Sequence, residues 1–201
     1  MDWILRQSTT EEKDLGVYVT PDTSPTVHIS KVAAKANSLL GRIKKTFTCM
    51  DKEIFLSLYL TLVRPRMEYA VQGWSPYKIK DINVLERIQR RATKLVPQLR
   101  DLPYNERLNA LGLTTLQERR TRGDMIEVFK MLNGYEDIDC SKFFQVERRE
   151  RYETRGHRWK LQKPRFRTTK RSNFFDARII NNWNSLPENV VNSSSINMFS
   201  E

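Results

Sequence analysis

The chain has 201 residues, of which 39% are hydrophobic, and a formal net charge of +11 at pH 7. This length allows one ordinary domain or two small ones, and no run of about 18 to 20 apolar residues could span a membrane. The two cysteines and two histidines are too dispersed for a disulfide framework or a zinc site. We therefore expect a protein without metal or other cofactor and without membrane contact, which lies inside the cell, in the nucleus or cytoplasm.

Residues 1–27 predict a short β element. Apolar and polar positions alternate from Asp14 to Val19, and the alternation stops at Pro21, which is typical of one strand that ends in a turn. Gly16, inside this strand, predicts either a bulge or a close backbone approach.

Residues 28–134 predict a bundle of about five helices, so the expected fold class is mainly α. The first helix covers residues 28–47, because its apolar residues recur at spacings of three and four and form one stripe. The second begins after the N-cap residue Asp51 and is kinked or ended by Pro65. An irregular connector follows at residues 69–77. The other three helices are expected from near Asp81 to Leu95, from Pro103 to Leu111, and from Thr114 or Thr115 to Gly134.

Residues 135–201 predict a basic, partly irregular region that contains a short helix near residues 172–184. Another helix begins at residues 194–196, where the sequence is about to stop, and this pattern suggests truncation. The acidic residues Glu136, Asp137 and Asp139 could hold a cation, but a solvated loop is the better interpretation because no strand pattern flanks them.

The strongest local signal is a basic segment at residues 148–171, with eleven Arg or Lys residues against two Glu. Such a segment is often a disordered tail, but its aromatic residues Tyr152, Trp159 and Phe166 are costly to leave in water and could stack on a splayed base. We therefore predict contact with nucleic-acid phosphates. The candidate binding residues here are Arg155, His157, Arg158, Trp159, Lys160, Lys163, Arg165 and Arg167.

Two predicted helices carry further candidates at helical spacing, although for the second set a merely solvent-facing role is at least as good an interpretation. These residues are Lys31, Lys35, Arg42 and Lys45 on the first helix, and Arg87, Arg90, Arg91 and Lys94 on the third.

No catalytic residue is predicted. Cys49 and Cys140 have no histidine near them in sequence and are interpreted as small, often buried residues. His157 is expected to contact a phosphate or an aromatic neighbour rather than to act as a base. Glycines are scattered, so the sequence has no phosphate-cradling loop.

Several short strings, in this order, resemble the region that follows the catalytic palm in reverse transcriptases of LINE-type, non-LTR retrotransposons, the jockey-like group. They are residues 13–17 (KDLGV), 62–69 (LVRPRMEY), 85–94 (LERIQRRATK), 104–108 (YNERL), 116–120 (LQERR), 154–157 (TRGH) and 183–187 (WNSLP).

The resemblance implies a division of labour. Residues 1–27 would be the end of the palm, near the grip on the primer strand, residues 28–134 a thumb-like helical bundle against the template and primer duplex, and residues 135–201 a basic C-terminal region. The family's catalytic pair of adjacent Asp residues is absent, because this sequence contains no Asp-Asp pair. The fingers and most of the palm are missing too, so the expected protein is a non-catalytic fragment that contacts RNA or an RNA–DNA duplex and is not an enzyme as it stands.

Two alternatives stay open. The chain could be a helical protein-interaction module whose basic segment engages an acidic partner, in which case replacing Arg155, Arg158, Arg165 and Arg167 by Glu would abolish a protein complex but not nucleic-acid retention. It could also be the non-functional product of a decayed mobile element.

Overall fold

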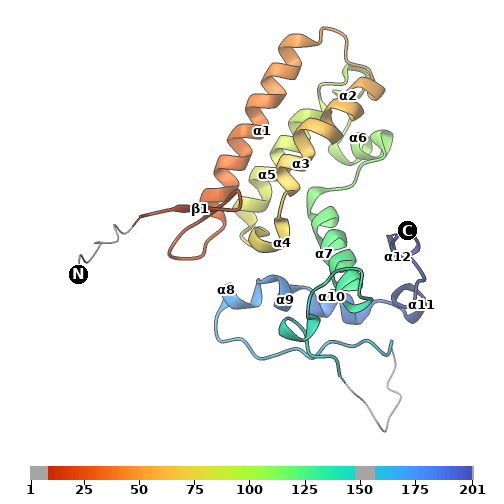
Figure 1. Cartoon of the computed structure of the whole chain (residues 1–201). Helices are drawn as coiled ribbons and strands as arrows, with labels where there is room; N and C mark the ends of the chain where they lie inside the picture. Colours follow the sequence, from red (N-terminus) through yellow and green to blue (C-terminus); the bar gives the residue numbers. More distant parts are fainter. Residues whose placement is uncertain (1–8, 148–156, 201) are drawn as a thin grey trace. The chain divides into compact units, whose positions relative to one another are not determined.

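The computed structural model describes residues 9–147 and 157–200 (Figure 1). The fold is mainly α, with one two-stranded antiparallel sheet near the N-terminus. The chain divides into two compact units, Met1–Thr115 and Leu116–Glu201. In the described part of the chain, no helix combines the length and the apolar character needed to cross a membrane.

The predicted single strand at residues 14–19 is instead a hairpin of β1 (Glu12–Asp14) and β2 (Val17–Val19). The two residues between the strands, Leu15 and Gly16, have φ of 44° and 89°, as the loop of a type I′ turn requires. Neither predicted reason for Gly16 is found: the strand register has no bulge, and the nearest group is a side chain, since a Cβ at Gly16 would lie 3.3 Å from Cε1 of the Tyr69 ring.

The remaining elements of the first unit follow the predicted order with two local differences. They are α1 (Thr26–Thr46), α2 (Lys52–Leu58), the π-helix η1 (Tyr59–Val63), α3 (Arg64–Glu68), α4 (Val71–Trp74), α5 (Ile79–Thr93), the 3-10 helix η2 (Pro97–Leu99) and α6 (Tyr104–Leu111). The predicted connector contains the single turn α4, whose Trp74 is buried in the core. Pro65 does not end the second helix, because the wider π-turn before it accommodates the missing N–H.

Helix ends agree with their local signals. Asp51 caps α2, because its Oδ1 accepts the Ile54 backbone N–H at 2.7 Å. Gly112 ends α6 with a φ of 64°, which glycine adopts without strain.

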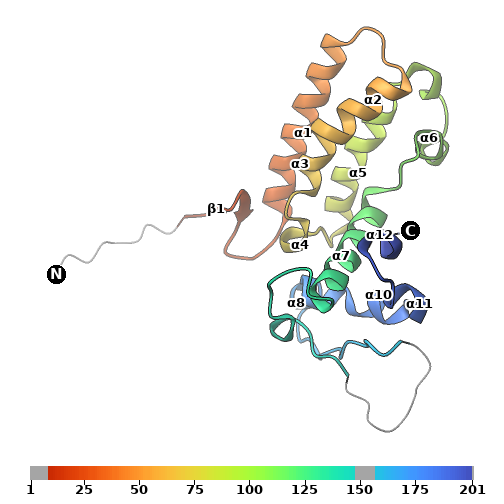
Figure 2. The same ribbon diagram turned by 45° about the vertical axis from the view of Figure 1, so that its right-hand side comes forward.

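Helices α1 and α5 lie side by side and run in the same direction (Figures 1 and 2). Near their N-terminal ends the Thr26 hydroxyl donates to Asp81 Oδ2 at 2.8 Å, and about three turns further on Arg91 Nη1 donates to Asn37 Oδ1 at 3.1 Å. Since 11 residues of α1 match 10 of α5 between these two contacts, the helices stay in register. Their buried faces contribute to the core of the first unit; its buried members include Ile29, Ala36, Leu40, Phe55, Tyr59, Val63, Met67, Leu85, Ile88 and Ala92.

The second unit begins with α7 (Leu116–Leu132), a helix that the sequence places in the predicted bundle at residues 28–134. The structure divides the chain before this helix rather than at residue 134, because α7 buries its apolar face among aromatic and aliphatic residues from the end of the chain. The core of this unit consists of Val128, Phe129, Met131, Phe144, Leu161, Ile179, Ile180, Trp183, Val191 and Phe199.

The other elements of this unit are short: η3 (Cys140–Lys142), α8 (Thr169–Ser172), α9 (Phe175–Arg178), α10 (Ile180–Ser185), α11 (Glu188–Val191) and α12 (Ile196–Ser200). The single helix predicted near residues 172–184 is therefore broken. Ser172 Oγ and Asn173 Nδ2 both donate to the Thr169 carbonyl, at 2.9 and 2.6 Å, which competes with continuation of the helix.

Candidate nucleic-acid interface

Helix α1 presents a line of cations to solvent. It carries five Lys or Arg residues and no Asp or Glu. Lys31, Lys35, Arg42 and Lys45 recur at intervals of four, seven and three residues, which places them on one side, opposite the buried stripe. At 1.5 Å per residue, this line is about 21 Å long.

Helix α5 presents a second line made of Arg87, Arg90 and Arg91, and Lys94 continues it at the C-cap. Its two carboxylates, Asp81 and Glu86, are 3% and 7% exposed and point into the unit. Asp81 accepts the Thr26 hydroxyl, and Glu86 accepts the Tyr104 hydroxyl. All exposed charges on α1 and α5 are consequently positive.

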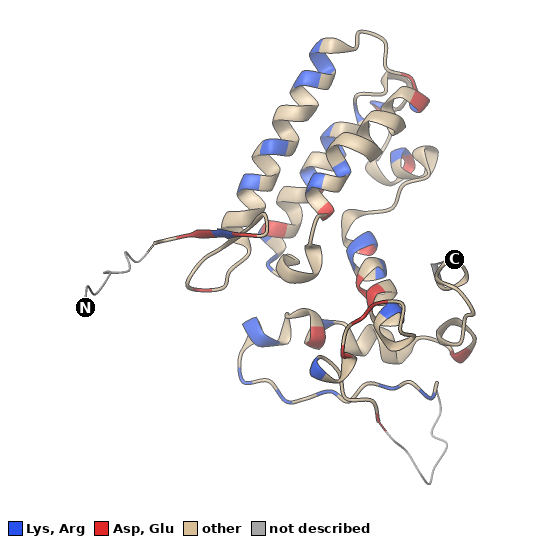
Figure 3. Ribbon diagram, in the orientation of Figure 1, with Lys and Arg blue, Asp and Glu red and all other residues tan. Residues whose placement is uncertain are grey.

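Because α1 and α5 pack in register, their two lines of cations both lie on the solvent-facing side of this helix pair. Figure 3 shows the basic residues as bands along both helices. We call the eight predicted side chains together the basic face; they are Lys31, Lys35, Arg42, Lys45, Arg87, Arg90, Arg91 and Lys94.

Neighbouring side chains hold several of these cations in place. Lys31 pairs with Glu11, and its ammonium lies 3.8 Å from the centre of the Tyr18 ring. The Arg90 guanidinium lies 4.5 Å from the centre of the Tyr104 ring. The ring contacts limit the conformational freedom that these long side chains would otherwise lose on binding, whereas the Glu11 carboxylate offsets part of the Lys31 charge.

His157 does not contribute to an exposed basic surface, so its predicted role in phosphate binding is wrong. Its side chain is 2% exposed, Nε2 lies 3.0 Å from the Trp183 carbonyl oxygen, and the ring meets the Trp183 ring edge-on. Burial lowers the pKa of His157, which favours the neutral ring. The other predicted contact, an aromatic neighbour, is correct.

Two further residues of the basic segment serve the fold. Trp159 packs against the core of the second unit, so it is not available as an open stacking platform. Lys160 donates to the Asn184 carbonyl. Arg158 is exposed beside the Trp159 ring. Arg155 and Tyr152 lie outside the described residues.

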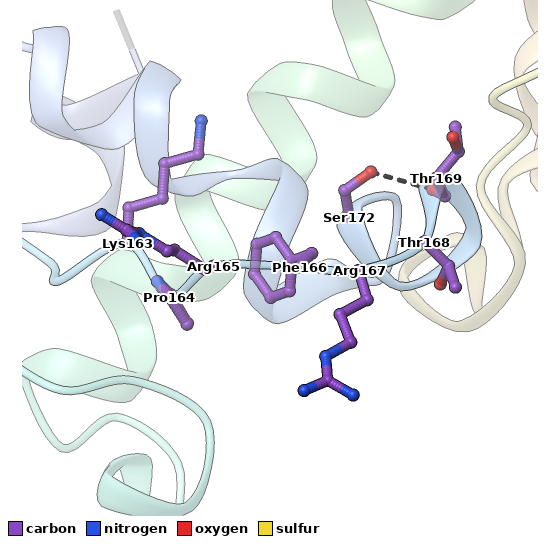
Figure 4. A pocket seen from close by; sticks show the side chains of 8 residues that line it. All are labelled: Lys163, Pro164, Arg165, Phe166, Arg167, Thr168, Thr169 and Ser172. Carbon is purple, nitrogen blue, oxygen red and sulfur yellow. Dashed lines mark hydrogen bonds between the residues drawn. The ribbon is translucent and has the colours of Figure 1, made fainter.

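The exposed remainder of the segment surrounds a groove. Lys163, Arg165 and Arg167 are exposed, and they line an open pocket of about 630 Å³ together with Pro164, Phe166, Thr168, Thr169 and Ser172 (Figure 4). The chain approaches this groove after an antiparallel pairing in which Glu147 N donates to the Lys160 carbonyl and Gln162 N donates to the Gln145 carbonyl, both at 2.8 Å.

Among the described residues, no group of three or more His, Cys, Asp or Glu side chains could hold a metal ion. In the acidic loop, Asp139 Oδ1 accepts the Ser141 N–H at 3.1 Å, and Glu136 accepts from Lys130 at 3.3 Å. These carboxylates therefore have structural partners, as a solvated loop would. Cys49 is exposed rather than buried, and Cys140 is half-buried.

Sequence reasoning missed the inward position of Asp81 and Glu86, on which the uniform charge of the basic face depends. A signal for Asp81 was present, because it precedes Leu85 by four residues and Ile88 by seven and so shares their buried face. Glu86 carried no such signal, since its partner Tyr104 comes from another helix.

Comparisons with protein-family models, with curated proteins and with solved structures found no match to this chain.

Proposed function

We propose that this chain binds the phosphate backbone of RNA or an RNA–DNA duplex through the basic face. The observation that carries the proposal is the charge distribution on α1 and α5, where the exposed charges are all positive and the carboxylates of α5 are buried. Proteins that bind nucleic acid through its backbone gain most of their affinity from Lys and Arg that displace condensed counterions. A line of cations about 21 Å long suits this purpose, since it can follow several successive phosphates.

The basic face has little means of reading sequence. Its charged groups are on the outward sides of helices that pack in a core, and phosphate contacts position a partner without specifying bases. We therefore expect binding that depends on backbone charge and shape more than on sequence.

The resemblance to non-LTR retrotransposon reverse transcriptases supports the same proposal. Its string at residues 85–94 covers the C-terminal part of α5 and the C-cap residue Lys94, and so contains the four residues that supply half of the basic face. We propose that the chain corresponds to the part of such a polymerase that follows the palm and that it performs no catalysis alone, because it has no Asp-Asp pair.

Charge reversal tests the proposal. The variant Arg42→Glu with Arg87→Glu should weaken binding of a short RNA–DNA duplex by about 10-fold or more, since each lost phosphate contact and each added repulsion acts against association. Fluorescence anisotropy at moderate salt measures this change.

A matched control makes the same charge change elsewhere in the first unit. Lys52→Glu with Arg66→Glu alters exposed cations on α2 and α3, so its affinity should stay within about threefold of the unmodified chain. Equal losses in both variants would mean that total charge, and not the basic face, governs binding.

A further inference from the structure

The groove at residues 163–172 is built on a fixed backbone although residues 162–167 form neither helix nor strand. Before it, the Asn184 side chain clamps Leu161, accepting its N–H at Oδ1 and donating to its carbonyl from Nδ2, both at 2.8 Å. Pro164 then disfavours a helical conformation at Lys163, which is in neither a helix nor a strand. These contacts therefore constrain the path of the chain where it enters the groove.

The far end of the groove is equally constrained. Thr168 caps α8 by accepting the Arg171 N–H. Arg171 makes a two-pronged ion pair with Asp176, at 2.7 and 2.5 Å, and its guanidinium lies 5.1 Å from the centre of the Phe166 ring. Because Asp176 neutralises Arg171, this arginine positions the ring and leaves the groove's charge to other residues.

The groove combines three kinds of group that recognise one ligand chemistry. Figure 4 shows the Phe166 ring at its middle, with Lys163 and Arg165 on one side and Arg167 and the hydroxyl residues on the other. No Asp or Glu occurs between residues 157 and 175, so no acidic side chain from this stretch opposes an anion. Phe166 is half-buried but lines this open groove, and an aromatic ring flanked by cations is the arrangement that binds a base and its neighbouring phosphates.

We propose that this groove holds single-stranded nucleic acid, with Phe166 stacked on one base and Lys163, Arg165 and Arg167 at the adjacent phosphates. A duplex cannot satisfy the ring, because its bases are already stacked, whereas an unpaired base can. This inference deepens the proposed function and rests on it, but it assigns a different partner strand to a different unit of the chain.

The test compares two ligands with two variants of the full chain. For a single-stranded RNA of about ten nucleotides, Phe166→Ala should weaken binding by about 5- to 150-fold, the range expected for loss of one base stack. Its affinity for an RNA–DNA duplex should stay within about twofold. Phe166→Trp should retain single-strand binding, and Phe143→Ala, which removes another exposed ring of the same unit, should leave it unchanged.

A single strand with abasic sites separates stacking from folding. The unmodified chain and Phe166→Ala should bind this ligand equally, since no base is present to stack. If Phe166→Ala weakens binding to abasic and normal strands alike, or changes neither, the groove does not stack a base. The inference would also be overturned if Phe166→Ala abolished binding of an acidic protein partner and left binding of single-stranded RNA unchanged. If the charge-reversal test on the basic face fails, the duplex-binding proposal is removed. The effect of Phe166→Ala on single-strand binding can still be interpreted in that case.

Discussion

At the residue scale, His157 shows how a side chain with cations on both sides in sequence can belong to a core. Its Nε2 lies 3.0 Å from the Trp183 carbonyl oxygen, while its buried Nδ1 has no hydrogen-bond partner in the described part of the chain. Burial and the nearby charge of Lys160 lower its pKa, and the Trp183 carbonyl and Glu188 only partly oppose this effect. The neutral ring, which donates from Nε2, is the form that fits.

A pH titration should reveal this environment. The folded chain should bind a proton at His157 only below the ordinary value of about 6.5, whereas the unfolded chain binds it near that value. The stability of the second unit is therefore full above pH 6.5 and decreases as the pH falls through the folded pKa. The ring proton resonances of His157, followed by NMR, should titrate below 6.5; a midpoint at or above 6.5 would contradict the buried position.

The buried ion pair of Asp124 and Arg178 should matter more than the exposed pair of Arg171 and Asp176. Asp124 accepts from Arg178 Nε and Nη2 at 2.8 and 2.9 Å, and its side chain is 5% exposed. Asp124→Ala removes the buried carboxylate that accepts both of these hydrogen bonds and should lower the free energy of unfolding by about 3 kcal/mol. Asp176→Ala should cost less than about 1 kcal/mol, because the Arg171 side chain is 42% exposed. Urea unfolding, followed by hydrogen exchange at the amides of α10, measures the loss of stability in both variants. Equal losses would show that burial of the ion pair is unimportant.

Single residues of the candidate site were predictable where they lie on regular helices. The eight members of the basic face follow from spacing alone, because a period of 3.6 residues assigns each cation to a side. His157 and Trp159 lie in an irregular stretch with no such period, and their burial depends on Trp183, which is more than 20 residues away. No local pattern could supply that information.

At the element scale, α5 connects the core to the basic face. Its inner side buries Leu85, Ile88 and Ala92, and its outer side bears the arginines. A network below it joins Tyr59, Gln89 and Tyr104: the Tyr59 hydroxyl donates to Gln89 Oε1 at 2.6 Å, and Gln89 Nε2 donates to the Tyr104 hydroxyl at 3.0 Å. Burial raises the pKa of both tyrosines well above their usual range, so both hydroxyls keep their protons and can donate.

Two substitutions on α5 test which side carries its stability. Leu85 is 0% exposed, so Leu85→Ala should lower the free energy of unfolding by about 2 to 5 kcal/mol. Ile79 is 77% exposed on the same helix, and Ile79→Ala should change it by less than about 0.5 kcal/mol. Thermal or urea unfolding, followed by circular dichroism, compares the two variants. Similar effects would contradict the burial of Leu85 in the core and the exposure of Ile79.

Helix existence was easier to predict than helix continuity. α1 and α6 begin and end within two residues of the expected positions, because apolar periodicity and the Gly112 cap mark them clearly. The π-turn before Pro65 and the break at Asn173 arise when backbone groups find other partners, an outcome that an apolar pattern does not encode.

At the scale of the whole molecule, the chain consists of two compact units with separate cores. The sequence placed α7 with the preceding helices, because its own apolar stripe does not say which surface will cover it. Its real partners include Trp183 and Phe199, more than 50 residues later. Packing over such a distance in sequence decides the boundary between the units.

The salt dependence of binding to an RNA–DNA duplex tests the central claim most directly. If the basic face neutralises about five to eight phosphates, the logarithm of the affinity of the full chain should fall against the logarithm of salt concentration with a slope between about −4 and −7. The slope should become shallower by about 1 to 2 in the Arg42→Glu, Arg87→Glu variant, which loses two of these contacts. A slope near zero, or one that this variant leaves unchanged, would contradict phosphate binding by the basic face.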